Sequence, residues 1–120
     1  MKLPNIFERE VTPLSVSAGE VIYSEGETPN AMYVVQSGEV EIKIGGTSME
    51  VVGPDGFFGE MALIEQSRRT GTAVAKTDCT IVPINEKHFL FMVEETPFFA
   101  LTVMRTMVAR LRRGMGLSSM

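Results

Sequence analysis

Cysteine and histidine are almost absent from this sequence of 120 residues, which has one of each, Cys79 and His88. A single cysteine excludes an intrachain disulfide and favours a reducing compartment, so we expect a cytoplasmic location. A single histidine supplies too few ligands for a histidine metal site, and it is the only histidine base for a serine or cysteine nucleophile. We therefore expect no metal site, no catalytic residue and no enzymatic activity.

Long apolar runs and an excess of positive charge are also lacking. No apolar run reaches about 18 residues, so we expect no membrane span, and no signal peptide is evident at the N-terminus. A net charge of -4 and a sequence pI of about 5.0 argue against general affinity for nucleic acid. Four arginines near the C-terminal end are interpreted as complementing the dipole of a last helix: Arg105, Arg110, Arg112 and Arg113. Few residues follow them, so we expect no helix-turn-helix for reading DNA.

The middle of the chain has a residue pattern typical of antiparallel sheet. A length of 120 residues suits one domain, which we take as residues 1–120. Short runs rich in β-branched and aromatic residues alternate with glycine and proline turns, and this pattern is typical of a sandwich or jelly roll over about residues 15–84. Strands are predicted at or near residues 16, 21–23, 31–36, 39–44, 49–52, 72–75 and 79–84. Before them, Leu3, Ile6 and Phe7 have helical spacing and predict a short helix.

Two helices are predicted to close the chain over about residues 85–113. Asn85 is a plausible N-cap for the first, which ends near Glu95, and Pro97 suits the first position of the second. Apolar residues of the second helix repeat at intervals of 3, 4, 3 and 4: Leu101, Met104, Val108, Leu111 and Met115. This repeat fits an amphipathic helix that docks on the sheet, a dimer seam or a lid over a ligand.

The stretch from Phe57 to Thr72 carries the features of an anion site. Gly56 and Gly59 flank two phenylalanines, and the helix-forming residues 60–66 follow, so a strand is expected to end in a tight turn that opens a short helix. Uncovered backbone N–H groups at a helix start suit an anion. Nine residues after Glu60, Arg69 could lay a planar guanidinium across two phosphate oxygens.

Glu60 indicates what else the ligand contains. A carboxylate beside a phosphate repels it unless the carboxylate faces another part of the ligand, and a sugar hydroxyl is its natural partner. A ribose phosphate has both groups. Each residue taken alone also fits a structural role: Glu60 as an acidic residue in a first helical turn, Arg69 as a surface charge and Gly59 as a turn glycine.

Together, residues 58–63 (Phe-Gly-Glu-Met-Ala-Leu) and then Arg69, Thr70 and Thr72 resemble the phosphate-binding cassette of the cyclic nucleotide-binding domain family. Gly71 stands where alanine is usual, and the resemblance extends over roughly residues 16–113. It implies a mainly β fold, an antiparallel jelly roll with a short cassette helix and two C-terminal helices. The ligand-binding residues that it implies are Phe58, Gly59, Glu60, Met61, Ala62, Arg69, Thr70 and Thr72.

The resemblance also implies a ligand, a mechanism and partners. The ligand is cAMP or cGMP, with no further cofactor, and Leu111 or Arg112 serves as a lid that reaches the base. The chain is then a sensor module that couples nucleotide binding to movement of its last helix. A homodimer through that helix or a separate effector protein would receive the signal. The alternative is a ligand-free protein-interaction domain on the same fold.

Overall fold

A computed structural model describes residues 11–114 of the chain. The short helix predicted from Leu3, Ile6 and Phe7 lies outside the described residues, as does Met115. The chain divides after Glu86 into two compact units.

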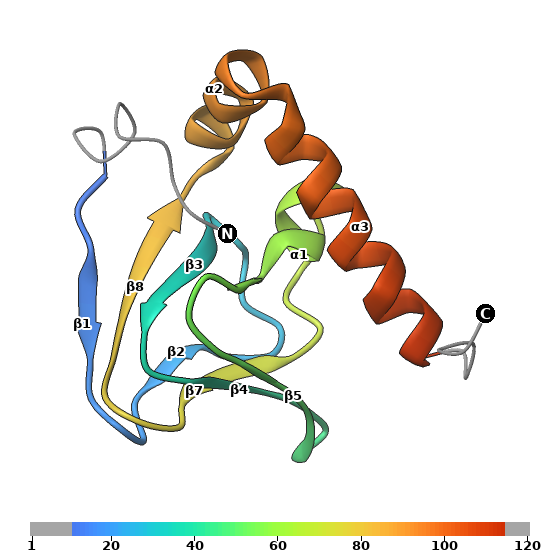
Figure 1. Cartoon of the computed structure of the whole chain (residues 1–120). Helices are drawn as coiled ribbons and strands as arrows, with labels where there is room; N and C mark the ends of the chain where they lie inside the picture. The colour runs from blue at the N-terminus through green and yellow to red at the C-terminus, as the bar shows by residue number, and fades with distance from the viewer. Residues whose placement is uncertain (1–10, 115–120) are drawn as a thin grey trace. The chain divides into compact units, whose positions relative to one another are not determined.

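Two four-stranded antiparallel sheets make up the first unit (Figure 1). One sheet has the order β1 (Leu14–Val16), β8 (Cys79–Ile84), β3 (Met32–Ser37) and β6 (Phe57–Phe58). The other has the order β2 (Val21–Tyr23), β7 (Thr72–Ala75), β4 (Val40–Ile44) and β5 (Thr47–Val52). These sheets confirm the predicted jelly roll, and the strand positions agree with the sequence pattern to within a few residues.

Alternating side chains from both sheets form the core. Val35 and Ile81 face it from one sheet, and Val40 and Ala73 face it from the other. Each of these four residues is fully buried, as period-two patterning of half-buried strands requires. Cys79 is buried in β8, as its position in a predicted strand indicates.

The predicted cassette helix is present as α1 (Glu60–Glu65) and follows directly on the β6 strand and a single turn residue. That residue is Gly59, which has a φ of 80°, in the left-handed region that residues with a Cβ rarely adopt. Gln66 ends the helix in the same left-handed conformation, and its N–H donates to the carbonyl of Ala62. The sequence pattern therefore places the helix correctly and its end one residue too late.

The second unit begins at Lys87, in the first turn of α2 (Glu86–Glu95), and also contains α3 (Pro97–Gly114). The Thr96 N–H donates to the Met92 carbonyl at 2.8 Å and closes α2, and the Phe99 N–H donates to Thr96 at 2.8 Å and opens α3. Phe89 and Phe99 meet edge to face with ring centroids 5.4 Å apart. The helix break at Thr96–Pro97 is confirmed. Neither of these helices, nor α1, is long and apolar enough to cross a membrane within residues 11–114.

Candidate ligand-binding site

Arg69 is the centre of the site, and the fold shields its side chain from water. The residue is 4% exposed. Its Nη1 donates to the Gly59 carbonyl at 2.7 Å, and its Nη2 donates to the Ala31 carbonyl. Because a buried charge is costly without hydrogen-bonding partners, these two backbone acceptors are what allow the guanidinium to stay inside.

The backbone of Arg69 is bound to the loop between β2 and β3. Its N–H donates to the Glu27 carbonyl at 2.9 Å, and its carbonyl accepts from the Gly26 N–H at 2.8 Å. Side chain and backbone thus join Arg69 to residues 26–31 and to the Gly59 turn at once. This double attachment fixes where the guanidinium points.

Arg68 lies next to Arg69 in the chain and points the other way. It is exposed, and its Nη1 donates to the Gly26 carbonyl at 3.0 Å. In an extended segment successive side chains alternate in direction, so a buried residue 69 requires an outward residue 68. The structure has this arrangement, and it makes Arg68 a matched control for Arg69.

Glu60 is the second buried charge of the site. It is 2% exposed at the first position of α1, and Glu60 and Arg69 are the two buried charged residues among the described part of the chain. The residue before Glu60 is Gly59, whose carbonyl holds Arg69, so both charges converge on one turn. Burial of two ionisable side chains at one turn is costly for stability and is typical of a functional site.

An aromatic cluster lies beside the arginine. The guanidinium carbon of Arg69 is 3.9 Å from the centroid of the Tyr23 ring. Tyr33 and Phe58 stack with centroids 5.2 Å apart, and Tyr23 contacts both rings at about 6 Å. Burial raises the pKa of the Tyr33 hydroxyl, while the Arg69 charge opposes that rise and Glu27 adds to it. Tyr23 carries no local signal in the sequence, because only folding brings β2 beside Arg69.

The structure brings together the charged part of the predicted site. Phe58, Gly59, Glu60 and Arg69 meet around the β6–α1 turn, and Ala62 is buried in α1. Met61 is 47% exposed on α1. Leu111 and Arg112, the predicted lid, lie in the second unit and are exposed.

The two predicted threonines differ in their surroundings. Thr70 is exposed beside Arg69. Thr72 is half-buried at the start of β7, and its hydroxyl accepts from the Glu25 N–H at 3.1 Å. This hydrogen bond fastens the β2–β3 loop to β7, so Thr72 has a structural task, and its part in ligand binding stays a prediction.

A Cβ at Gly59 would fill space that the site needs. It would lie 2.8 Å from Nη1 of Arg69 and 3.3 Å from the Tyr23 ring. Glycine is therefore required twice, for its positive φ and for the close approach of the guanidinium. Within residues 11–114, no group of three or more histidine, cysteine, aspartate or glutamate side chains could hold a metal ion.

A jelly roll interrupted by a glycine turn and a short helix, with one buried cation and one buried carboxylate at the turn, has the features of a small-ligand-binding domain. Residues 13–96 match the family model of the cyclic nucleotide-binding domain, and the chain belongs to this family.

Relatives of known identity agree with this assignment. The cyclic AMP receptor protein of Thermus thermophilus is 29% identical over 111 residues, which cover 88% of this chain and 50% of that protein. The crystal structure of the Thermus thermophilus catabolite activator protein matches with a TM-score of 0.80 at 25% identity, covering 92% of this chain and 54% of that one. A second solved structure matches with a TM-score of 0.75 at 25% identity, and the match covers 89% of each chain. Its description concerns a cyclic-GMP-dependent signalling pathway that regulates bacterial phytopathogenesis. The chain thus spans about half the length of the Thermus proteins.

Proposed function

We propose that this chain binds cAMP and cGMP at the β6–α1 turn, with cAMP as the physiological ligand, and that it acts as a cytoplasmic regulatory module without enzymatic activity. The observation that carries the proposal is the burial of Arg69 and Glu60, at 4% and 2% exposure, at the two charged positions of the family cassette. Relatives named for cyclic AMP and cyclic GMP support the choice of ligand.

Arg69 and Glu60 contact different parts of the ligand. The Arg69 guanidinium has five N–H donors and gives one bond to each of two carbonyls, so further donors remain for the cyclic phosphate. Glu60 accepts hydrogen bonds from the ribose hydroxyl. Phe58, Met61 and Ala62 shape the turn and the first part of α1 around the phosphate. Thr70, exposed next to Arg69, reaches the base, and its hydroxyl can meet the amino group of guanine.

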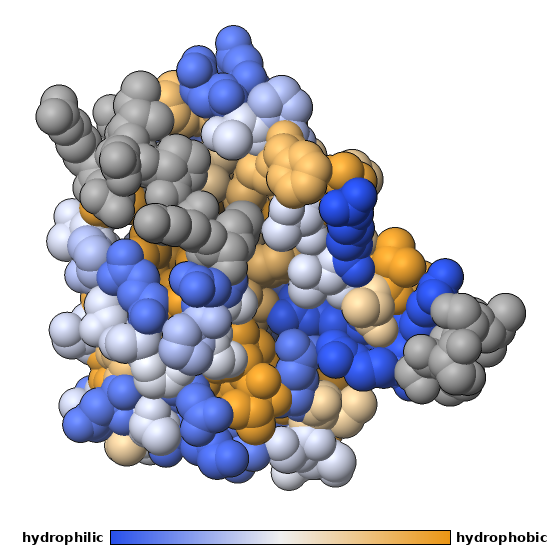
Figure 2. Space-filling view, in the orientation of Figure 1, coloured by the Kyte–Doolittle hydropathy of each residue, from blue (hydrophilic) through white to orange (hydrophobic). Residues whose placement is uncertain are grey.

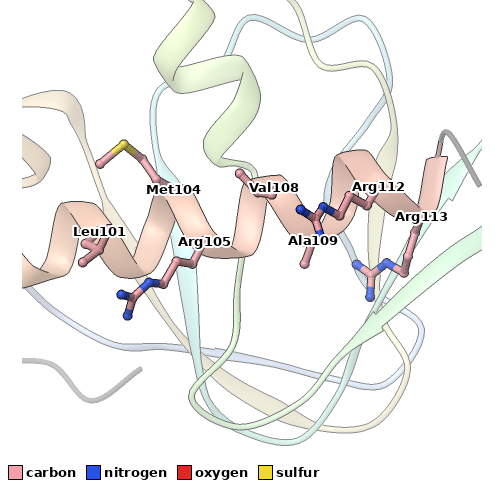
Figure 3. Close-up of a pocket in the computed structure, with 7 residues that line it drawn as sticks. All are labelled: Leu101, Met104, Arg105, Val108, Ala109, Arg112 and Arg113. Atoms are coloured by element: carbon pink, nitrogen blue, oxygen red, sulfur yellow. The ribbon is translucent and has the colours of Figure 1, made fainter. Parts of the chain in front are cut away.

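The last helix is the element that we assign to signalling. It has an exposed row of apolar residues, and a hollow along it is lined by Leu101, Met104 and Val108 together with Arg105, Ala109, Arg112 and Arg113 (Figure 3). Hydrophobic and hydrophilic residues lie side by side along this helix (Figure 2). Because Met104, Val108 and Leu111 are each about half exposed or more, we propose that this row forms a homodimer seam or contacts an effector protein.

Unfolding with and without nucleotide tests the proposal against a ligand-free interaction domain. A ligand at 100 times its dissociation constant adds about 2.7 kcal/mol to the free energy of unfolding. We expect cAMP and cGMP to raise the unfolding midpoint, and 5′-AMP and 5′-GMP, which lack the cyclic phosphate, to leave it unchanged. If cAMP, cGMP and a cyclic dinucleotide all leave the unfolding midpoint unchanged, the chain is a ligand-free interaction domain.

A further inference from the structure

We propose that Tyr23 is a positioning residue for ligand binding, whose ring holds the Arg69 guanidinium ready for the cyclic phosphate; this inference rests on the proposed function. The guanidinium carbon lies 3.9 Å from the ring centroid, a distance typical of a cation over an aromatic face. Tyr23 is 8% exposed, so water does not screen the contact effectively.

Strand β2 carries an irregularity that turns Tyr23 inward. Val21 and Tyr23 are two residues apart and would share a face in a regular strand. Val21 is nevertheless 55% exposed while Tyr23 is 8% exposed. Between them the pairing of β2 with β7 shifts register, and such shifts commonly re-aim side chains near functional sites. The irregularity therefore accounts for a tyrosine ring beneath Arg69.

The ring and the Gly59 turn confine the guanidinium together. Nη1 donates to the Gly59 carbonyl at 2.7 Å, and a Cβ at Gly59 would come within 3.3 Å of the Tyr23 ring. Arginine, ring and turn are therefore in close contact. An arginine side chain has large rotamer freedom, and ordering it before the ligand arrives removes that cost from binding.

An aromatic ring suits this task better than another acceptor would. A carboxylate partner for Arg69 would neutralise its charge and occupy its N–H donors. The face of a ring attracts the cation without taking an N–H, so the charge and the remaining donors stay available to a phosphate. Tyr23 thus orders the Arg69 side chain and leaves the N–H donors that contact the ligand unoccupied by Tyr23.

Tyr23→Phe and Tyr23→Leu test the role of the ring. The first variant keeps the aromatic face, and the second removes it while keeping an apolar side chain. Tyr33→Leu is the matched packing control, because Tyr33 belongs to the same aromatic cluster while the guanidinium lies over Tyr23. If Tyr23→Leu does not fold, Tyr23→Met replaces it, since methionine fills irregular spaces.

The first measurement needs no nucleotide. A ring over the guanidinium shifts the Nε–H resonance of Arg69 in the NMR spectrum, and this resonance is identified by its loss in Arg69→Lys. We expect the shift in the parent chain, in Tyr23→Phe and in Tyr33→Leu. In Tyr23→Leu we expect the Nε–H resonance of Arg69 to lie at the chemical shift of the exposed arginines. A parent spectrum without the shift would contradict the ring contact.

The second measurement is calorimetric titration of the same proteins with cAMP. We expect Tyr23→Phe and Tyr33→Leu to bind within about threefold of the parent and Tyr23→Leu to bind about 5- to 30-fold more weakly. Parent-like affinity in Tyr23→Leu would overturn the positioning role while the proposed function stands. If the parent chain shows the resonance shift but binds no cyclic nucleotide, the proposed function is wrong. The role of Tyr23 in ligand binding is then wrong as well.

Discussion

Arg69 shows how a charged side chain is kept inside a small β domain. Two backbone carbonyls and one aromatic ring surround its guanidinium, and no carboxylate is among these contacts. The positive charge is therefore held but not neutralised by them. Such a charge is costly in a free protein and becomes favourable when an anion binds, which is the behaviour that a phosphate sensor needs.

Arg69→Ala is expected to weaken cAMP binding by roughly 30-fold or more. Truncating one partner of a buried charged contact costs about 2 to 5 kcal/mol. Arg68→Ala is the control, because it removes only the exposed hydrogen bond to the Gly26 carbonyl, and its affinity should stay within about threefold of the parent. Competition with a fluorescent cyclic nucleotide measures both, after each variant is shown to be folded. A greater loss in the Arg68 variant would mean that the register of the cassette is wrong.

Glu60→Gln is expected to weaken cAMP binding less than Arg69→Ala, by about 3- to 10-fold. A hydrogen bond to a charged acceptor is worth about 1.5 to 3 kcal/mol, and removing the carboxylate also relieves its repulsion with the phosphate. The matched ligand is 2′-deoxy-cAMP, which lacks the ribose hydroxyl. The substitution should not weaken binding of this ligand and should strengthen it slightly, because only the repulsion between the carboxylate and the phosphate is removed. An equal loss for both ligands would show that Glu60 does not contact the 2′-hydroxyl.

Local patterns predict the charged residues of the site but not their surroundings. The spacing of Gly59, Glu60 and Arg69 indicates a turn, a helix and a returning strand, and alternation places Arg69 inside once Arg68 is outside. The Tyr23 contact depends on a register irregularity and on pairing between distant strands. The hydrogen bond that the Thr72 hydroxyl accepts from the Glu25 N–H depends on the same long-range folding.

Among the elements, the β6–α1 turn places a left-handed glycine directly against the buried arginine. Gly59 combines a φ of 80° with a guanidinium nitrogen 2.8 Å from where its Cβ would be. Gly46, in the turn between β4 and β5, has a φ of 82° and open space around it. The two glycines therefore share the same backbone requirement and differ in what lies next to them.

Gly59→Ala and Gly46→Ala separate backbone strain from displacement of Arg69. Forcing alanine into the left-handed region should lower the free energy of unfolding by about 1 to 2 kcal/mol in both variants, and Gly59→Ala should lose more because its Cβ also displaces Nη1 of Arg69. Only Gly59→Ala should also weaken cAMP binding, by about tenfold or more. Urea unfolding and a binding titration measure the two effects. Equal affinity in the two variants would mean that the close approach at Gly59 does not matter for binding.

The last helix, α3, is the element that we propose for signalling. Proline fixes the break between α2 and α3, and the apolar repeat of α3 was recognisable from sequence because both signals are local. Its partner is not a local property. Docking on the sheets, dimerisation and capping of a ligand all use the same amphipathic pattern, so the sequence leaves the three open.

Nucleotide binding is expected to slow amide hydrogen exchange in residues 98–113 as well as in the cassette. This follows if α3 is the element with two positions and Leu111 or Arg112 closes over the base. Exchange measured by mass spectrometry with and without cAMP tests it. Protection confined to residues 57–72 would describe a nucleotide-binding domain whose last helix does not respond.

For the molecule as a whole, family membership and fold agree. Glycine and proline turns and period-two patterning predicted the strands, and the family resemblance selected the jelly roll. Pairing of β1 with β8 and of β2 with β7 joins segments far apart in the sequence, so strand order could not be read from local signals. The chain spans about half of the length of the Thermus proteins.

Equilibrium dialysis of the parent chain against labelled cAMP measures nucleotide binding itself, because it counts bound nucleotide and does not depend on heat, fluorescence or stability. Unlabelled cAMP and cGMP should displace the label, and 5′-AMP should not. We expect saturation at one nucleotide per chain, in the site that Arg69 and Glu60 form. Equal concentrations of label on both sides of the membrane, with cAMP and again with cGMP as the labelled ligand, would contradict it.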